Sequence, residues 1–375
     1  MKLFQKIIDL TIKVIDSLFK YNKKSINLLR QNLLVFGAKV LFLTSDINWS
    51  IFWDGKSVTE NLKKLKLINA EVISPNIVSF LIARNKIIHW GSVDYLIDAK
   101  RFSYLSKSNK HVALYAHFRP NDARIKFIPS INKIVDIMHT PNSLNWKKLI
   151  EMGFDKEKTI IMPIGVDLKR FKKVDKNEKL RLREKFNLPK EKTIIGSFQK
   201  DGFGWGKGLE PKLEKGPDIF CEVVKKINEE HDIHILLIGP ARGFVKNKLK
   251  EYQIPHTHIF LKHYLNIVEY YNVLDLYIVT SRSEGGPKAL LESLATGVPI
   301  VTTNMGMAPD IIEHEFNGFI AEVDNVNQLS KYSIELINNE ELREKFASNG
   351  LSMIHNYSWE NISKKYYYKI YKRLL

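Results

Sequence analysis

The chain has 375 residues, a formal net charge of +17 and a single cysteine. Its length predicts two or three domains with full hydrophobic cores. The one cysteine, Cys221, cannot form an internal disulfide, which favours a reducing compartment. No stretch of about eighteen apolar residues occurs, so we expect no transmembrane helix. The basic excess suits nucleic acid, an anionic lipid surface or an anionic substrate.

Residues 1–36 form a basic N-terminal region. Within residues 1–31, seven basic side chains outnumber two acidic ones, and charges such as Lys6 and Asp9 argue against the apolar core of a secretory signal. Apolar residues recur there at three- and four-residue spacing, so a helix would have one apolar face. Residues 361–375 add five basic residues and four tyrosines without an acid. Both segments fit an anionic membrane surface, or packing on the first domain with solvated lysines.

Strand-like runs alternate with helical runs along the rest of the chain, which predicts parallel sheets covered by helices. The first series of strands is expected at 39–44, 70–73, 86–89, 112–116, 133–138 and 159–162. The second series is expected at 193–198, 233–238, 258–261, 276–279, 300–302 and 319–323. A charged stretch, 167–192, with a helix near 179–186, is interpreted as the linker between them. The pattern predicts an α/β protein with two Rossmann-like domains facing a central cleft.

Three histidines follow or end apolar strands. His117 comes directly after the run 112–116, at the carboxyl end where open α/β sheets bind ligands. His89 and His139 occupy similar places, and a lone histidine at a strand end is more often structural than catalytic. We therefore treat His117 as the strongest of the three candidates.

The most informative segment spans 281–299 and reads SRSEGGPKALLESLATGVP. It joins a strand to a helix and places Glu284 in the turn and Glu292 within the helix. The turn also contains Gly285, Gly286 and Pro287. The glycines leave amides free to hold an anion, and proline suits the first helical position. Backbone amides can bind a phosphate and the nearby carboxylates can bind hydroxyls, a combination that suits a phosphorylated sugar.

This pattern resembles the Glu-x7-Glu motif of retaining glycosyltransferases of the GT-B fold, in particular family 4. The resemblance extends to MPIGVDLKRF at 162–171, Glu214–Lys215–Gly216, Asn317–Gly318 and Trp359. It implies an acceptor domain at 37–187, completed by a C-terminal helix at 356–375, and a nucleotide-sugar donor domain at 188–355.

The resemblance also implies an activity: transfer of a sugar from a UDP- or GDP-linked donor, with retention, to a cell-surface glycan or glycolipid. Glu292 would bind the ribose, Glu284 the donor sugar and Lys215 the diphosphate, while His117 would contact the transferred sugar. Lysines and helix-terminal amides would replace a metal ion, and no cofactor is expected. A cytoplasmic protein, bound peripherally to the inner face of the cell membrane, would suit such an acceptor.

One departure from the family pattern concerns an arginine. Members carry glycine-arginine after the strand that opens the donor domain, whereas this chain reads GSFQK and then DGFGWGKGLEPKLE. Lys200 or Lys207 would have to supply the missing charge, without the bidentate fork of arginine. A GT-B epimerase or phosphorylase, a basic nucleic-acid-binding protein and an inactive structural partner remain as alternatives.

Overall fold

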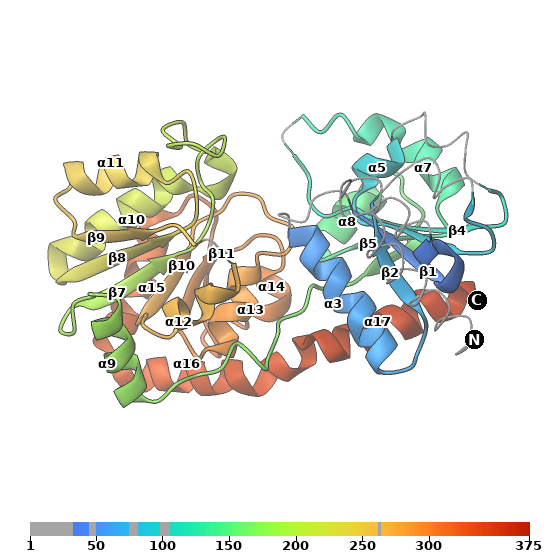
Figure 1. Cartoon of the computed structure of the whole chain (residues 1–375). Helices are drawn as coiled ribbons and strands as arrows, with labels where there is room; N and C mark the ends of the chain where they lie inside the picture. The colour runs from blue at the N-terminus through green and yellow to red at the C-terminus, as the bar shows by residue number, and fades with distance from the viewer. Residues whose placement is uncertain (1–32, 45–49, 75–81, 98–105, 120, 262–263) are drawn as a thin grey trace, which may run out of the picture. The chain divides into compact units, whose positions relative to one another are not determined.

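The computed structural model describes residues 33–44, 50–74, 82–97, 106–119, 121–261 and 264–375. The amphipathic region predicted at 1–31 lies outside these residues. The chain divides into two compact units (Figure 1). Unit 1 comprises residues 1–141, 145–164 and 359–375, and unit 2 comprises 142–144 and 165–358. No helix in the described part of the chain is long and apolar enough to cross a membrane.

Unit 1 is built on a six-stranded parallel sheet in the order β2-β1-β3-β4-β5-β6. Its strands are β1 (Val40–Leu43), β2 (Ala70–Ile73), β3 (Ile87–Trp90), β4 (Lys110–Leu114), β5 (Ile137–Thr140) and β6 (Thr159–Ile161). Strands β1, β3 and β5 are buried along their whole length, as expected of a parallel sheet covered on both faces.

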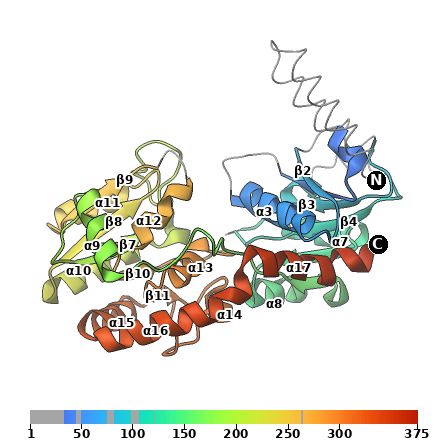
Figure 2. The same cartoon turned by 60° about the horizontal axis from the view of Figure 1, so that its bottom comes forward.

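Helices cover this sheet in unit 1. They are α3 (Ser50–Lys64), α5 (Val93–Ile97), α7 (Ile128–Ile134), α8 (Ser143–Glu151) and α17 (Trp359–Lys369). The last of these, α17, packs against α3 (Figure 2). Residues 359–375, which include α17, group with unit 1, whereas the C-terminal helix was predicted to span 356–375.

Unit 2 contains a second six-stranded parallel sheet in the order β12-β11-β10-β7-β8-β9. Its strands are β7 (Thr193–Ser197), β8 (Ile233–Ile238), β9 (His256–Ile259), β10 (Leu276–Val279), β11 (Ile300–Thr303) and β12 (Phe319–Ala321). Numbered from β7 as strand one, the order is 3-2-1-4-5-6, which reverses between β7 and β10. In such sheets ligands bind beyond the carboxyl ends of the strands at the point of reversal.

Helices of unit 2 lie on both faces of this sheet (Figure 1). They are α9 (Lys176–Lys185), α10 (Pro217–Glu230), α11 (Gly243–Glu251), α12 (Val268–Tyr271), α13 (Lys288–Ala295), α14 (Ala308–Ile311), α15 (Val326–Asn338) and α16 (Glu340–Met353). The core of the unit joins apolar residues of β7, β8 and β10 to the buried faces of α10, α11 and α15.

Two predicted boundaries were wrong. The run 133–138 was expected to be a strand, but residues Ile128–Ile134 form α7, and β5 begins only at Ile137. The stretch 167–192 was interpreted as a linker, yet it groups with unit 2, so the division lies at 164/165 rather than 187/188. The reason is a set of ion pairs: Asp275 binds Lys179 at 2.7 Å and Arg183 at 2.5 Å, which fastens α9 to the start of β10.

Candidate functional site

The candidate site of unit 2 lies where its strand order reverses. The segment after β7 leads to a short 3-10 turn at Leu213–Lys215 and to the N-terminus of α10. The segment after β10 leads to the N-terminus of α13. Two helix N-termini, each with a partial positive charge, therefore belong to the segments that flank the reversal point.

Backbone hydrogen bonds join these two segments. The amides of Arg282 and Ser283 donate to the carbonyl of Glu214 at 2.9 and 3.1 Å. Gly216 has a φ of +62° and packs against Thr280. A Cβ at this position would lie only 1.9 Å from the Thr280 carbonyl oxygen, so only glycine fits here. The Thr280 hydroxyl donates back to the Gly216 carbonyl at 2.7 Å. The turn before α10 is therefore shaped to fit the end of β10.

This joining brings Lys215 and Glu284 together. The Lys215 Nζ lies 2.5 Å from the Glu284 Oε1, and the side chains are 26% and 14% exposed. Ser281 also donates to the same carboxylate oxygen at 3.3 Å. A lysine ammonium has three donors, so Lys215 can hold Glu284 and still bind an anion. The predicted phosphate ligand and the predicted sugar ligand are thus direct neighbours.

The glycine turn beside them has open amides. Among the described residues, none accepts a hydrogen bond from the amide of Gly285 or Gly286. Gly306 has a φ of +53° and packs against this turn. A Cβ at Gly306 would lie 2.9 Å from the carbonyl oxygens of Glu284 and Gly285. Pro287 was expected at the first helical position, but it is the N-cap of α13, and the helix begins one residue later at Lys288. Free amides at a helix N-terminus are suited to bind an anion.

Glu292 lies deeper than Glu284. It is 5% exposed, and its Oε2 accepts a hydrogen bond from the Tyr271 hydroxyl at 2.8 Å. Tyr271 belongs to an aromatic cluster with Phe198 and Tyr277 beneath the end of β7. Tyr271 was not predicted from the sequence, because α12 precedes β10 in the chain and meets α13 only in the folded unit.

Arg242, which no sequence pattern indicates, supports the turn after β7. Its Nη1 donates to the carbonyls of Ser197 and Gln199 at 2.7 and 2.6 Å, and its Nη2 pairs with Asp201 at 3.0 Å. Both charged side chains are buried, and burial raises the pKa of Asp201 although Arg242 opposes the shift. Gln199 in turn donates to the Lys215 carbonyl at 3.2 Å. Arg242 therefore positions the backbone, and because it is buried against Asp201 it does not supply the charge of the arginine missing from the family pattern.

The two candidate replacement lysines have different surroundings. The Lys200 Nζ lies 4.0 Å from the centre of the Trp205 ring, and burial, followed by Lys212, lowers the pKa of Lys200. Lys207 is exposed on the loop that follows. Lys200 remains close in sequence to Gln199, which contacts Lys215, so it is the better placed of the two.

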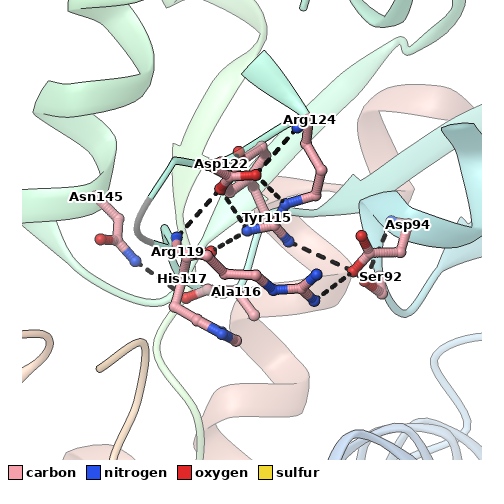
Figure 3. Close-up of polar contacts among 9 residues, drawn as sticks. All are labelled: Ser92, Asp94, Tyr115, Ala116, His117, Arg119, Asp122, Arg124 and Asn145. Atoms are coloured by element: carbon pink, nitrogen blue, oxygen red, sulfur yellow. Dashed lines mark hydrogen bonds and ion pairs between the residues drawn. The ribbon is translucent and has the colours of Figure 1, made fainter. Parts of the chain in front are cut away.

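In unit 1, His117 lies on the loop after β4, as predicted, and is partly buried. Its carbonyl accepts a hydrogen bond from Arg124 at 2.6 Å, whereas its imidazole points away from this network (Figure 3). Asp122 binds Arg124 at 2.6 Å and the Tyr115 hydroxyl at 2.9 Å. Burial alone would raise the pKa of Asp122, but hydrogen bonds from Arg124 and Tyr115 hold it far below its usual value. This ionised pair fixes the loop that carries His117.

Arg119, near the same loop, extends toward solvent. It is half exposed and binds Asp94 at 3.0 Å (Figure 3). Asp122, by contrast, is buried at the centre of the network.

His89 and His139 have a structural role. Both are fully buried, and their Nε2 atoms lie 2.8 Å apart. The His89 Nδ1 lies 2.7 Å from the hydroxyl of Tyr371, which follows α17. Burial lowers the pKa of His139 to about 3, and burial together with His139 lowers the pKa of His89 well below its ordinary value. Tyr366 is buried beside them, so two of the four C-terminal tyrosines pack inside unit 1 rather than at a surface.

Comparisons with known proteins relate part of the chain to glycosyltransferases. Residues 210–353 match the model of the family Glycosyl transferases group 1. The chain is 31% identical over 150 residues to the uncharacterized glycosyltransferase MJ1178 of Methanocaldococcus jannaschii, an alignment that covers 39% of this chain and 42% of that protein. It is 25% identical over 242 residues to the capsular polysaccharide biosynthesis glycosyltransferase CapM of Staphylococcus aureus, covering 60% and 57%. The matches thus span about half the length of these relatives.

Among solved structures, Anabaena Alr3699/HepE in complex with UDP-glucose superposes with a TM-score of 0.74 and 15% identity, over 89% of this chain and 100% of that chain. This likeness concerns the fold. The two Rossmann-like units thus have the GT-B fold, and residues 210–353 of the chain carry the sequence pattern of glycosyl transferases group 1.

Proposed function

We propose that this protein is a retaining, metal-independent glycosyltransferase that uses a nucleotide-sugar donor. The observation that carries the proposal is the Lys215–Glu284 pair, 2.5 Å apart beside the open amides of Gly285 and Gly286 at the N-terminus of α13. A cation and free amides bind a diphosphate, and an adjacent carboxylate binds sugar hydroxyls.

Each candidate residue has a distinct role in the proposed reaction. Lys215, aided by Lys200, neutralises the diphosphate, and Glu292, held by Tyr271, binds the nucleotide ribose. Glu284 orients the donor sugar. His117 is the candidate of unit 1 for contact with the transferred sugar, as the family resemblance implies.

The proposed chemistry needs no enzyme nucleophile. The bond between the anomeric carbon and the phosphate oxygen breaks, and the electron pair leaves with the nucleoside diphosphate. The acceptor oxygen bonds to the same face of that carbon, and its proton passes to the departing phosphate. Lysine and amides stabilise the charge that develops on the phosphate.

The relatives suggest the substrates. HepE was solved in complex with UDP-glucose, which supports a UDP-linked donor, with a GDP-linked donor as the other expectation. CapM is named for capsular polysaccharide biosynthesis, which supports a cell-surface glycan or glycolipid acceptor. A place in the cytoplasm, on the inner face of the membrane, would give the enzyme access to both substrates.

Metal independence has a direct test. Within the described residues, no three metal-ligating side chains gather as a candidate metal site. If Lys215 and amides carry the diphosphate charge, EDTA leaves sugar transfer nearly unchanged. Loss of most turnover with EDTA, restored by magnesium or manganese, contradicts the proposed site.

A thermal-shift panel of nucleotide sugars tests the proposal as a whole. A ligand that binds only the native state raises the melting temperature by mass action, so one nucleotide sugar should shift it while its free sugar does not. NMR of the product then reads the anomeric configuration. Consumption of donor without acceptor would identify an epimerase instead, and a salt-sensitive shift of oligonucleotides would identify a nucleic-acid binder.

A further inference from the structure

The loop at 202–213 of unit 2 exposes an unusual amount of apolar surface. Four large apolar side chains are about half exposed or more: Phe203 (48%), Trp205 (66%), Leu209 (58%) and Leu213 (54%). A cluster of exposed apolar residues in so short a segment marks an interaction surface, whereas scattered ones would not.

The base of this loop is fixed. Gly202 and Pro211 pair as an antiparallel bridge, and the amide of Phe203 donates to the Glu210 carbonyl at 3.0 Å. A Cβ at Gly202 or Gly208 would lie 2.3 or 2.2 Å from the Ala241 carbonyl oxygen, so the loop sits directly on the turn after β8. The first amides of α11, from Gly243 and Phe244, donate to the loop carbonyls.

The tip of the loop, by contrast, projects into open space. A Cβ at Gly206 would meet no atom within 4 Å, and one at Gly204 would meet only the amide of Gly206 at 4.0 Å. Trp205 lies between these two glycines at the most exposed point. The loop projects from unit 2 beside α10 and α11 (Figure 1). Because the base of the loop is fixed, the projecting Trp205 side chain can insert into an apolar environment without refolding of the loop.

The apolar tip is surrounded by positive charge. Lys200 stacks on Trp205 at 4.0 Å, and Lys212 stacks on Phe203 at 5.5 Å. Lys207 is exposed where the loop meets α11, its carbonyl accepting a hydrogen bond from the Gly243 amide, and Lys246 lies on α11 itself. Within the described chain, none of these four lysines forms an ion pair with a carboxylate. Glu210 and Glu214 are the nearby acids in sequence, which leaves a basic excess.

We propose that the 202–213 loop is an interfacial anchor that inserts Trp205 and Phe203 into an anionic lipid surface. Tryptophan prefers the boundary between headgroups and acyl chains, and lysine stems bury along apolar surface while their charges meet lipid phosphates. Each lysine near such a surface contributes about 1 kcal/mol, a factor of about five in partitioning. The anchor does not require the N-terminal region, but it shares Lys200 with the proposed diphosphate site, and in that one respect it rests on the proposed function.

A dye at the tip tests this in the full-length protein. Gly206→Cys places a thiol where nothing is in contact, and the native Cys221 is buried with a pKa raised by burial to about 12, so it resists labelling. The thiol is labelled with an environment-sensitive NBD dye. Vesicles of equal parts phosphatidylcholine and phosphatidylglycerol should raise its emission, and a nitroxide on the lipid chains should quench it. Vesicles of phosphatidylcholine alone should have little effect.

Two control variants accompany this design: Glu229→Cys for the dye, and Leu180→Ala for the substitutions in the loop. Glu229→Cys places the dye at an exposed position twelve residues along α10, roughly 18 Å from the start of that helix, where no change is expected. Lys207→Gln should weaken vesicle partitioning about fivefold. Trp205→Ala should abolish most binding by the loop, whereas Leu180→Ala, which removes an exposed apolar residue of α9, should not.

Each other outcome overturns the anchor. An unchanged dye at position 206 while the protein pellets with anionic vesicles would assign binding to another segment. Failure to pellet at low salt would exclude lipid altogether. An emission change with a nucleoside diphosphate alone would assign the loop to the donor site, and a change with protein concentration alone would assign it to self-association.

Discussion

At the scale of single residues, Lys215 has the clearest part. Its carbonyl is held by Gln199, its neighbour Gly216 fits against Thr280, and its ammonium reaches Glu284. The backbone on both sides of the side chain is therefore fixed before any ligand binds. A pre-positioned cation loses little conformational entropy on binding an anion.

Lys215→Ala should weaken the binding of a nucleoside diphosphate by about 1.5–3 kcal/mol, the range for a hydrogen bond to a charged group. Isothermal titration measures this directly. Lys331→Ala, at an exposed position of α15, is the matched control and should bind as the parent does. Lys200→Ala and Lys207→Ala decide which lysine assists. Parent affinity in all three site variants would place the anion site elsewhere.

Substitutions of the two glutamates should affect different ligands. Glu292→Gln should weaken the binding of the intact donor and the binding of the nucleoside diphosphate alike, because both ligands contain the ribose. Glu284→Gln should leave nucleoside diphosphate affinity close to that of the parent and reduce kcat for the intact donor. Equal losses in both variants, in binding and in turnover, would show that the assigned roles are wrong.

At the scale of elements, the site depends on two turns that meet. The turn before α10 and the loop after β10 are joined by the amides of Arg282 and Ser283. Arg282 adds ion pairs to Asp218 on α10 and to Asp324, both at 2.6 Å. The relative position of Lys215 and Glu284 is thus set by backbone contacts and does not depend on the side chains alone.

Gly216→Ala should destabilise unit 2 by roughly 2–4 kcal/mol, because a methyl group would clash with the Thr280 carbonyl and the positive φ disfavours alanine. Chemical denaturation measures the change in the free energy of unfolding. Gly206→Ala is the control from the same chain: it lacks contacts and a positive φ, so its stability should match the parent. A similar loss in both variants would contradict the fitted turn.

At the scale of the whole molecule, burial of charge-capable groups sets the response to acid. His89 and His139 are neutral in the core of unit 1, and their pKa values are lowered by burial. In the unfolded chain histidine titrates near its ordinary pKa of about 6.5. Below about pH 6.5 the unfolded state therefore binds more protons than the folded state. The folded state loses stability relative to the unfolded state as the pH falls below this value.

The free energy of unfolding should fall between pH 6.5 and about 3, the pKa of folded His139, by up to about 1.4 kcal/mol per pH unit for each of the two histidines. Urea denaturation at several pH values measures the slope. His139→Gln should reduce the slope, because the buried imidazole that resists protonation is then absent. A parent stability that is flat across this window would contradict burial of the neutral pair.

The sequence by itself determined the alternation of strands and helices, and so the two parallel sheets. It also placed Glu284, Glu292 and the glycine turn between β10 and α13, because strand, turn and helix signals are local along the chain. Lys215 was found from a family pattern. These features depend on neighbouring residues, so a linear reading captures them.

Only the tertiary structure decided what depends on distant residues. Arg242 under the turn after β7, Tyr271 against Glu292 and Asp122 with Arg124 each join side chains whose roles no local pattern reveals. The linker became part of unit 2 because Asp275 pairs with two cations of α9. Buried charges must find partners wherever the fold supplies them, and those partners come from other elements of the sheet and its helices.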